Sequence, residues 1–323
     1  MVLESSPMRT FRIGVLSNLE PSLSETKLGH AVRNYLISCR ADGKSPATIK
    51  SYSQVLKALL VFYRDMSLKP EPKRIEASDI RLFFLSLQER GDSQATINRY
   101  YRCLGTFFRW LIAEGVADKN PLANIKPPRP EKKIVQPFSR GDIDSLLLQT
   151  SGSKFLDLRN RAIVLLFLDT GLRLSELANI QLDDMDFDEE TIRVTGKGAK
   201  QRVVRMGRQT QKALLRYLLA RDDGYPCLWV TEERRPLTKW GIKNMVRTIC
   251  RRAGVTDARP SAHTFRHTAA ISLLRNGAGE FTLQIMLGHS TLQMTRRYVA
   301  ALGQEDMIRA HRKFSPVDRL GIS

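Results

Sequence analysis

Apolar residues recur three and four positions apart through the first third of the chain, a spacing typical of amphipathic helices. The pattern predicts a first helix over about 28–39, a second from Ser45-Pro46, a third from Ser78 and a fourth from about Ser93. Serine accepts hydrogen bonds from free N–H groups at a helix start, and proline fits the first helical position. Four helices with short connections predict a helical bundle over 24–125.

Short alternating runs interrupt the helical periodicity in the second half of the chain. The runs 190–195 and 201–206 flank the turn GKGAK, whose glycines favour a β-hairpin. Residues 184–188 and 228–230 are further candidate strands. Helices are predicted at about 139–149, 158–168, from Arg173, 209–220, 238–253, 262–275, 280–287 and 291–300, with one more after Gly303. The expected fold class is mainly α with a small antiparallel sheet, in two domains, the second an α+β domain over 137–313.

Three segments lack an apolar period. Residues 1–23 are expected to be a flexible arm, and either Met1 or Met8 can be the start. Residues 126–136, KPPRPEKKIVQ, contain three prolines and are expected to form an extended linker between the domains. Residues 314–323 are expected to be a tail.

The charge is strongly positive, with 52 Lys and Arg against 33 Asp and Glu, a net charge of +19. Such an excess favours a polyanionic partner, either nucleic acid or an anionic membrane surface. Both predicted domains carry it, which suits a protein that contacts DNA with each of them. Candidate phosphate contacts are Lys44, Lys50, Lys57, Arg99, Arg102 and Arg109 on the bundle, Lys126, Lys132 and Lys133 in the linker, and Lys200 in the hairpin turn. Taken singly, each of the six bundle residues is more often part of a solvated helix face, but together they are candidate phosphate contacts.

Targeting and redox signals point to the cytoplasm. The sequence has no signal peptide and no apolar run of about 18 residues, so we expect no membrane-spanning helix. The four cysteines are scattered, with no CxxC pair, and are expected to be reduced thiols.

His263, Arg266 and His267 stand three and four residues apart, which places them on one face of a helix. The HxxxH spacing can bind zinc, but the glutamate of HExxH and a third ligand are missing, so we predict no metal site. Either histidine alone is more often a packed structural residue. An arginine between two histidines on an otherwise apolar helix indicates an anion such as phosphate.

Further polar groups occur in short motifs on either side of this helix. GLRLSE places Glu176 three residues after Arg173, on the same helix face. LGHS places His289 just after a helix that ends at glycine, and Tyr298 follows nine residues later. A lone tyrosine in that position is usually a packed amphipathic residue, and no single one of these motifs is specific.

Together the motifs resemble the tyrosine recombinase (phage integrase) family, with Xer-type recombinases closest in architecture. The resemblance rests on GLRLSE, a lysine in a hairpin turn, HTFRH, LGH and a downstream tyrosine, in this order. It extends from about Glu25 to the C-terminal helix. It implies a SAM-like core-binding bundle followed by a catalytic domain.

The resemblance implies specific roles in the cleavage of DNA. Tyr298 would attack a phosphate, form a 3′-phosphotyrosine and release a 5′-hydroxyl. Arg173 and Arg266 would hold the non-bridging oxygens. Lys197 would protonate the leaving oxygen as general acid, with Lys200 in the same turn as the competing candidate.

The remaining roles concern the histidines and the glutamate. His263 would accept the proton of the tyrosine hydroxyl, and His289 would donate a hydrogen bond to the phosphate. Glu176 would orient the arginine or histidine side chains, while His267 is expected to be structural. The chain departs from many relatives around the tyrosine, where Arg296-Arg297 precede it and Val299-Ala300 replace a Thr-His pair.

The resemblance also implies partners and excludes some cofactors. A covalent intermediate conserves the bond energy, so neither ATP nor a metal ion is expected. The expected partner is double-stranded DNA with paired recombination sites, exchanged through a Holliday junction by a homotetramer or heterotetramer. A second recombinase or accessory proteins are further candidate partners. Two alternatives stay open: a type IB topoisomerase-like DNA relaxase and a non-catalytic architectural DNA-binding protein. The sequence does not identify the target site or the biological role.

Overall fold

The computed structural model describes Leu23, residues 25–129 and residues 135–314, apart from the side chains of Lys197, Arg309, Lys313 and Phe314. The chain divides into two compact units, Met1–Lys132 and Lys133–Ser323. The predicted arm before Leu23, residues 315–323 of the predicted tail, and Lys132 and Lys133 of the predicted linker lie outside the described residues.

The N-terminal unit contains the four predicted helices. Thr26, Ser45 and Ser93 each cap one of them, because their hydroxyl oxygens accept hydrogen bonds from backbone N–H groups three residues on. The helices are α2 (Lys27–Ala41), α3 (Pro46–Asp65), α4 (Ala77–Glu89) and α5 (Gln94–Ala113), with a 3-10 turn at Pro72–Arg74. Helix α4 begins at Ala77, one residue before the predicted start at Ser78. Glu76 caps this end of the helix, and its N–H donates to Asp79 Oδ2 at 3.0 Å.

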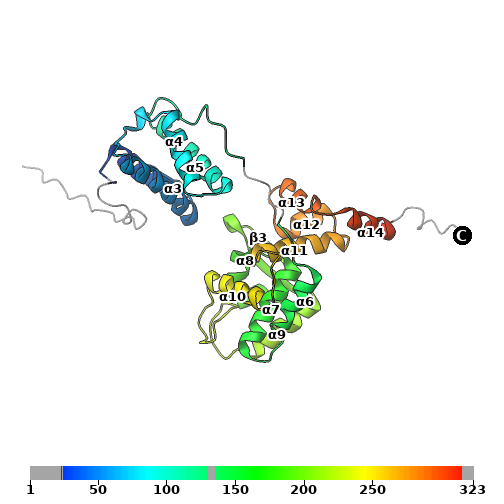
Figure 1. Ribbon diagram of the computed structural model, residues 1–323. Coiled ribbons are helices and arrows are strands. Elements are labelled where there is room, and N and C mark those ends of the chain that lie inside the picture. Colours follow the sequence, from blue (N-terminus) through cyan, green and yellow to red (C-terminus); the bar gives the residue numbers. More distant parts are fainter. Residues whose placement is uncertain (1–22, 24, 130–134, 315–323) are drawn as a thin grey trace, which may run out of the picture. The chain divides into compact units, whose positions relative to one another are not determined.

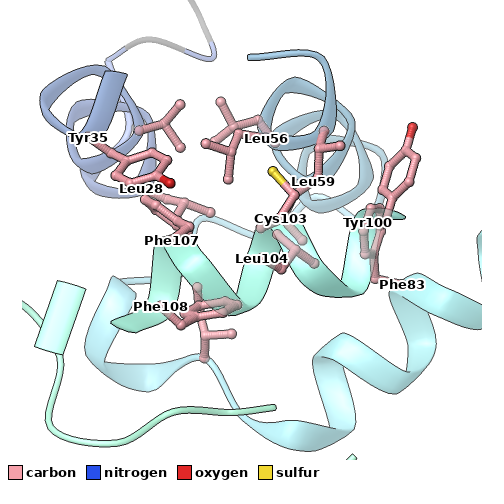
Figure 2. Close-up of a cluster of buried hydrophobic side chains, with 14 of the residues drawn as sticks. Leu28, Tyr35, Leu56, Leu59, Phe83, Tyr100, Cys103, Leu104, Phe107 and Phe108 are labelled. Carbon is pink, nitrogen blue, oxygen red and sulfur yellow. The ribbon is translucent and has the colours of Figure 1, made fainter. Parts of the chain in front are cut away.

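The core of this unit is a cluster of buried leucines and aromatic rings (Figure 2). Side chains from α2, α3, α4 and α5 converge there, with Phe107 and Tyr35 at a ring-centroid distance of 5.3 Å. Leu104, Phe107 and Phe108 of α5 have no exposed surface. One face of α5 is therefore committed to the core, which leaves its other face for contacts outside the unit.

The C-terminal unit is organised around α7 (Phe155–Thr170), which packs against α6 (Arg140–Leu148), α9 (Arg208–Leu219) and α11 (Ala262–Arg275) (Figure 1). Ala162, Ile163 and Val164 are buried in succession, as expected of a helix enclosed on most sides. The other helices are α8 (Leu174–Ala178), α10 (Lys239–Arg252), α12 (Glu280–Leu287), α13 (Leu292–Val299) and α14 (Gln304–Phe314), with a 3-10 turn at Leu182–Asp184.

A three-stranded antiparallel sheet follows α8 in the order β1 (Met185–Asp186), β2 (Thr191–Thr195) and β3 (Gln201–Arg205). The predicted hairpin is confirmed, with Thr195 opposite Gln201. Its turn contains a 3-10 segment, Lys197–Ala199. The candidate strand at 228–230 is wrong, because this stretch makes only one isolated bridge, Val230 with Pro236.

Two glycines allow helix ends to meet in the C-terminal unit. Gly171 ends α7 with a φ of 60°, and a Cβ there would lie 2.8 Å from Leu287 Cδ2. Gly288 ends α12 with a φ of 63°. Both positions need the left-handed backbone that glycine adopts at little cost. The end of α7, the start of α8 and the end of α12 are thereby brought to one place.

All four cysteines are free thiols, and Cys39, Cys103 and Cys250 are buried. Over the described ranges, no helix is long and apolar enough to cross a membrane.

Candidate active site

Glu176 of α8 binds two arginines. Its carboxylate accepts from the Arg173 backbone N–H at 2.8 Å and from Arg173 Nη1 at 2.7 Å. It also accepts from Nη1 and Nη2 of Arg202 on β3, at 2.9 Å and 3.0 Å. Burial raises the pKa of Glu176, but the hydrogen bonds from Arg202 and Arg173 outweigh it and lower the pKa to about 2. The carboxylate is therefore ionised at neutral pH and holds both guanidinium groups in place.

The end of α12 anchors three arginines through consecutive backbone carbonyls. Arg202 Nε donates to Met286 O at 3.0 Å, Arg266 Nη2 donates to Leu287 O at 2.7 Å, and Arg173 Nη2 donates to Gly288 O at 3.0 Å. These carbonyls have no partner within the helix, and they form the negative end of its dipole. A helix C-terminus thus positions the cationic groups of the site.

Arg266 is only 3% exposed. The hydrogen bonds of its side chain go to backbone carbonyls and to no carboxylate. Its Nη1 donates to Gly171 O at 2.8 Å. Burial and the neighbouring charge of Arg173 lower the pKa of Arg266 to about 10, while the charges of nearby Tyr298 and Glu176 act in the opposite direction. Of the neighbouring Arg173 and Arg266, only Arg173 pairs with a carboxylate, and this excess of positive charge favours the binding of an anion.

A pocket of about 300 Å³ lies beside these arginines. Its basic lining residues are Arg173, Lys243, Arg247, Arg259, His263 and Arg266, and no carboxylate lines it. Sequence reasoning missed Lys243, Arg247 and Arg259. A signal was present, because Lys243 and Arg247 stand four residues apart on the polar side of α10.

Tyr298 of α13 is fully buried between two histidine rings. The ring of His289 stacks on it at 5.8 Å with an interplanar angle of 3°, and the ring of His267 lies at 5.1 Å. Arg297 Nη2 donates to Tyr298 Oη at 3.1 Å, and its guanidinium lies 5.0 Å from the ring centroid. The phenol oxygen is therefore next to the positive charge of Arg297.

His289 is buried and is hydrogen-bonded on one side only. Its Nδ1 lies 2.8 Å from the hydroxyl oxygen of Thr295, while its Nε2 is buried without a partner. Burial, followed by the charges of Arg266 and Arg173, lowers the pKa of His289 to about 4. The ring is thus neutral at pH 7, with Nε2 able to serve a ligand.

His263 and His267 occupy different surroundings on α11. His263 lines the basic pocket, and burial, followed by the charges of Arg297 and Arg266, lowers its pKa. His267 is the histidine of this helix whose ring contacts Tyr298, and its Nε2 is buried without a partner. Burial and then His263 lower the pKa of His267.

The hairpin turn contains the two candidate lysines. Lys197 begins the 3-10 segment of the turn, and its side chain lies outside the described residues. Lys200 is exposed at the start of β3. Of the six predicted catalytic residues, Arg173, Arg266, His289 and Tyr298 are linked by shared contacts, and His263 joins them through the pocket.

Three of the predicted DNA contacts in the N-terminal unit lie together on the outer face of α5. Arg99, Arg102 and Arg109 are exposed and line a cavity of about 660 Å³ that has no carboxylate in its lining. The other predicted contacts in this unit are Lys44, Lys50 and Lys126, which are exposed, and Lys57, which is half-buried. No group of three or more His, Cys, Asp and Glu side chains that could hold a metal ion occurs in the described part of either unit.

Comparison with known proteins identifies similar chains. Residues 141–305 match the phage integrase family, and residues 32–118 match the phage integrase N-terminal SAM-like domain. The chain is 30% identical to tyrosine recombinase XerD of Oceanobacillus iheyensis, covering 84% of this chain and 93% of that protein. It is 32% identical to tyrosine recombinase XerC of Anoxybacillus flavithermus, covering 79% and 87%.

A solved structure shares the fold. It is the XerH site-specific recombinase bound to a palindromic difH substrate in a post-cleavage complex. The TM-score is 0.70 at 20% identity, with 94% of this chain and 93% of that chain covered. The predicted fold class, a mainly helical chain with a small antiparallel sheet, is confirmed.

Proposed function

Because the chain belongs to the phage integrase family and is a tyrosine-type site-specific recombinase, we propose that it cuts and rejoins duplex DNA through Tyr298. The observation that carries this proposal is that Arg173 and Arg266 are fixed on the carbonyls that precede His289, whose ring stacks on the buried phenol. The two arginines also line a pocket that no carboxylate lines. This arrangement suits a phosphodiester, which has one negative charge and two non-bridging oxygens.

The first chemical step is an in-line displacement at phosphorus. Tyr298 Oη forms a bond to phosphorus, the bond to the 5′ oxygen breaks, and Lys197 gives a proton to that oxygen. Arg173 and Arg266 hold the non-bridging oxygens, where negative charge increases in the transition state. Their guanidinium groups are fixed by carbonyls in advance, so little reorganisation is needed.

His289 contributes a neutral donor. Its lowered pKa keeps the ring uncharged, and a hydrogen bond donated by the Thr295 hydroxyl to Nδ1 leaves the ring proton on Nε2. Nε2–H can then donate to a phosphate oxygen, which gives the buried, unpaired Nε2 a partner. His263 accepts the phenol proton in this scheme, and His267 is the second candidate because its ring contacts Tyr298.

The covalent 3′-phosphotyrosine conserves the energy of the broken bond, so a second 5′-hydroxyl can attack it and reseal the strand without ATP or a metal ion. Two such exchanges on paired sites pass through a Holliday junction in a protein tetramer. The enzyme acts in the cytoplasm.

Phosphate contacts away from the reacting group hold the duplex. In the C-terminal unit they include Lys200 and the pocket residues Lys243, Arg247 and Arg259. In the N-terminal unit and the linker they are the predicted Lys44, Lys50, Lys57, Arg99, Arg102, Arg109, Lys126, Lys132 and Lys133. The cluster on α5 supports this assignment, because three exposed arginines line one cavity without acidic neighbours.

The test is covalent capture on nicked suicide duplexes of pooled sequence, in which the nick prevents rejoining. The wild type should form an adduct that survives denaturation, and sequencing of the captured DNA should give the site. Tyr298→Phe should form none. Tyr225→Phe, at a tyrosine that is 42% exposed in the same unit, is the matched control and should react normally. An adduct with Tyr298→Phe would show that the nucleophile is another residue. Relaxation of supercoiled DNA by the wild type without strand exchange would indicate the topoisomerase-like alternative.

A further inference from the structure

Arg202 connects the hairpin to the rest of the site. It lies on β3 opposite Val194, with only 14% of its side chain exposed. Its guanidinium donates twice to Glu176, at 2.9 Å and 3.0 Å, and once to Met286 O, at 3.0 Å. One side chain therefore joins β3, α8 and the end of α12.

The contact is closely fitted. A Cβ at Gly288 would lie 3.0 Å from Arg202 Nη1, and a Cβ at Gly196 would lie 3.9 Å from the same atom. Arg202 thus packs against both the residue that precedes His289 and the residue that precedes Lys197. A smaller or shorter side chain at position 202 would leave Glu176 with one cation instead of two. It would also leave space between the loops that contain Gly196 and Gly288.

The turn itself depends on this anchor. It contains two residues with positive φ, Gly198 at 76° and Ala199 at 58°, and the Gly196 N–H donates to Lys200 O at 2.8 Å. Lys200, the last residue of the turn, and Gln201, which follows it, are exposed. Arg202 is therefore the first residue after the turn whose side chain is held against other elements of the site.

We propose that Arg202 is a positioning residue that fixes the hairpin turn, and with it Lys197, relative to Arg173 through their shared carboxylate, Glu176. The inference rests on the proposed role of Lys197 as the general acid. Arg202 does not touch the phosphate in this scheme. Its loss impairs delivery of the proton to the 5′ oxygen more than it impairs binding of DNA or of the phosphate.

A substrate with sulfur in place of the bridging 5′ oxygen separates these steps. Breaking the P–O bond leaves an alkoxide that needs a proton, whereas breaking the P–S bond leaves a thiolate, which is stable because thiols ionise near pH 8.5. Arg202→Met should cleave the oxygen substrate about 100-fold more slowly than the wild type, in the range of general-acid effects. Arg202→Lys, which keeps the charge without the bidentate contact, should also be slow.

On the sulfur substrate both Arg202 variants and Lys197→Ala should regain nearly the wild-type rate, while Arg173→Ala should stay slow on both substrates. Arg205→Met is the matched control, because Arg205 lies on the same strand but pairs with Glu190 and is 77% exposed. It should behave as the wild type on both.

The outcomes distinguish the two proposals. If Lys197→Ala is not rescued by sulfur, the general-acid assignment fails. If Lys197→Ala is rescued but the Arg202 variants are not, the acid assignment stands and Arg202 is merely structural. Equal losses in Arg202→Met and Arg205→Met would also overturn the inference, since the effect would then belong to the strand as a whole.

Discussion

Replacing Glu176 with glutamine is expected to destabilise the C-terminal unit while keeping the shape of the side chain. The carboxylate accepts two hydrogen bonds from Arg173 and two from Arg202, and 1% of its side chain is exposed. A neutral amide would leave two guanidinium groups without a counter-charge and would direct its own N–H groups toward donors. Removing one partner of a buried ion pair costs about 3–5 kcal/mol. Because a third of the Arg173 side chain is exposed, at 33%, we expect a loss near the lower end, about 3 kcal/mol at pH 7.

The loss should depend on pH in a defined direction. The pKa of Glu176 is lowered from 4.5 to about 2 on folding. A group whose pKa is lowered stabilises the folded state fully above its unfolded pKa, and this contribution disappears as the pH falls through the folded pKa. The glutamine variant lacks this titration. The difference in unfolding free energy between the two proteins should therefore narrow by about 1 kcal/mol between pH 4.5 and pH 3.5.

Urea unfolding followed by the fluorescence of Trp229 measures this difference. Trp229 is 1% exposed and donates from its indole nitrogen to Leu177 O at 2.8 Å, next to Glu176. Changing Trp110 and Trp240 to Phe leaves it as the single probe. Glu190→Gln is the control, because Glu190 is the half-exposed partner of Arg205. This substitution should have little effect on the free energy of unfolding. A difference that stays constant from pH 7 to pH 3.5 would refute the reasoning.

Three further substitutions test the histidine and the pocket. Thr295→Val removes the partner of His289 Nδ1, and an unpaired buried nitrogen costs about 1–3 kcal/mol. Single-turnover cleavage should therefore slow by about ten-fold or more, while the affinity for DNA in a gel shift stays unchanged. A wild-type cleavage rate would contradict the assigned tautomer. Lys243→Gln and Arg247→Gln should each reduce the slope of log affinity against log salt by about one. Anisotropy titrations over a range of KCl concentrations measure the slope, and an unchanged slope would exclude these side chains as phosphate contacts.

Local signals account for the parts of the fold and site that could be predicted. Ser45, Ser93 and Ser261 cap helices at the predicted places because a hydroxyl bonds to an N–H only three residues away. The pairing of Arg173 with Glu176 has the same local origin. Such contacts depend on spacing within one turn of helix, which can be read directly from the chain.

Contacts between distant elements could not be predicted in this way. Arg202 reaches a carboxylate 26 positions away in the sequence, and Arg173 reaches a carbonyl 115 positions away. The ring contact between His267, which is expected to be structural, and Tyr298 is of the same kind. Which of several arginines or histidines meets a given partner depends on how the helices pack, and periodicity along one helix contains no information about that packing.

The LGH motif illustrates how a local pattern can have a non-local purpose. Its glycine ends α12 in the left-handed conformation, and the carbonyls that follow Ile285 have no partner within the helix. The backbone carbonyls of Met286, Leu287 and Gly288 each accept a hydrogen bond from a different arginine of the site. A residue with a side chain at Gly288 would both strain the backbone and meet Arg202 at 3.0 Å. The glycine is therefore needed for the arrangement of the cations, and the histidine that follows it enters the site because the same helix end is fixed there.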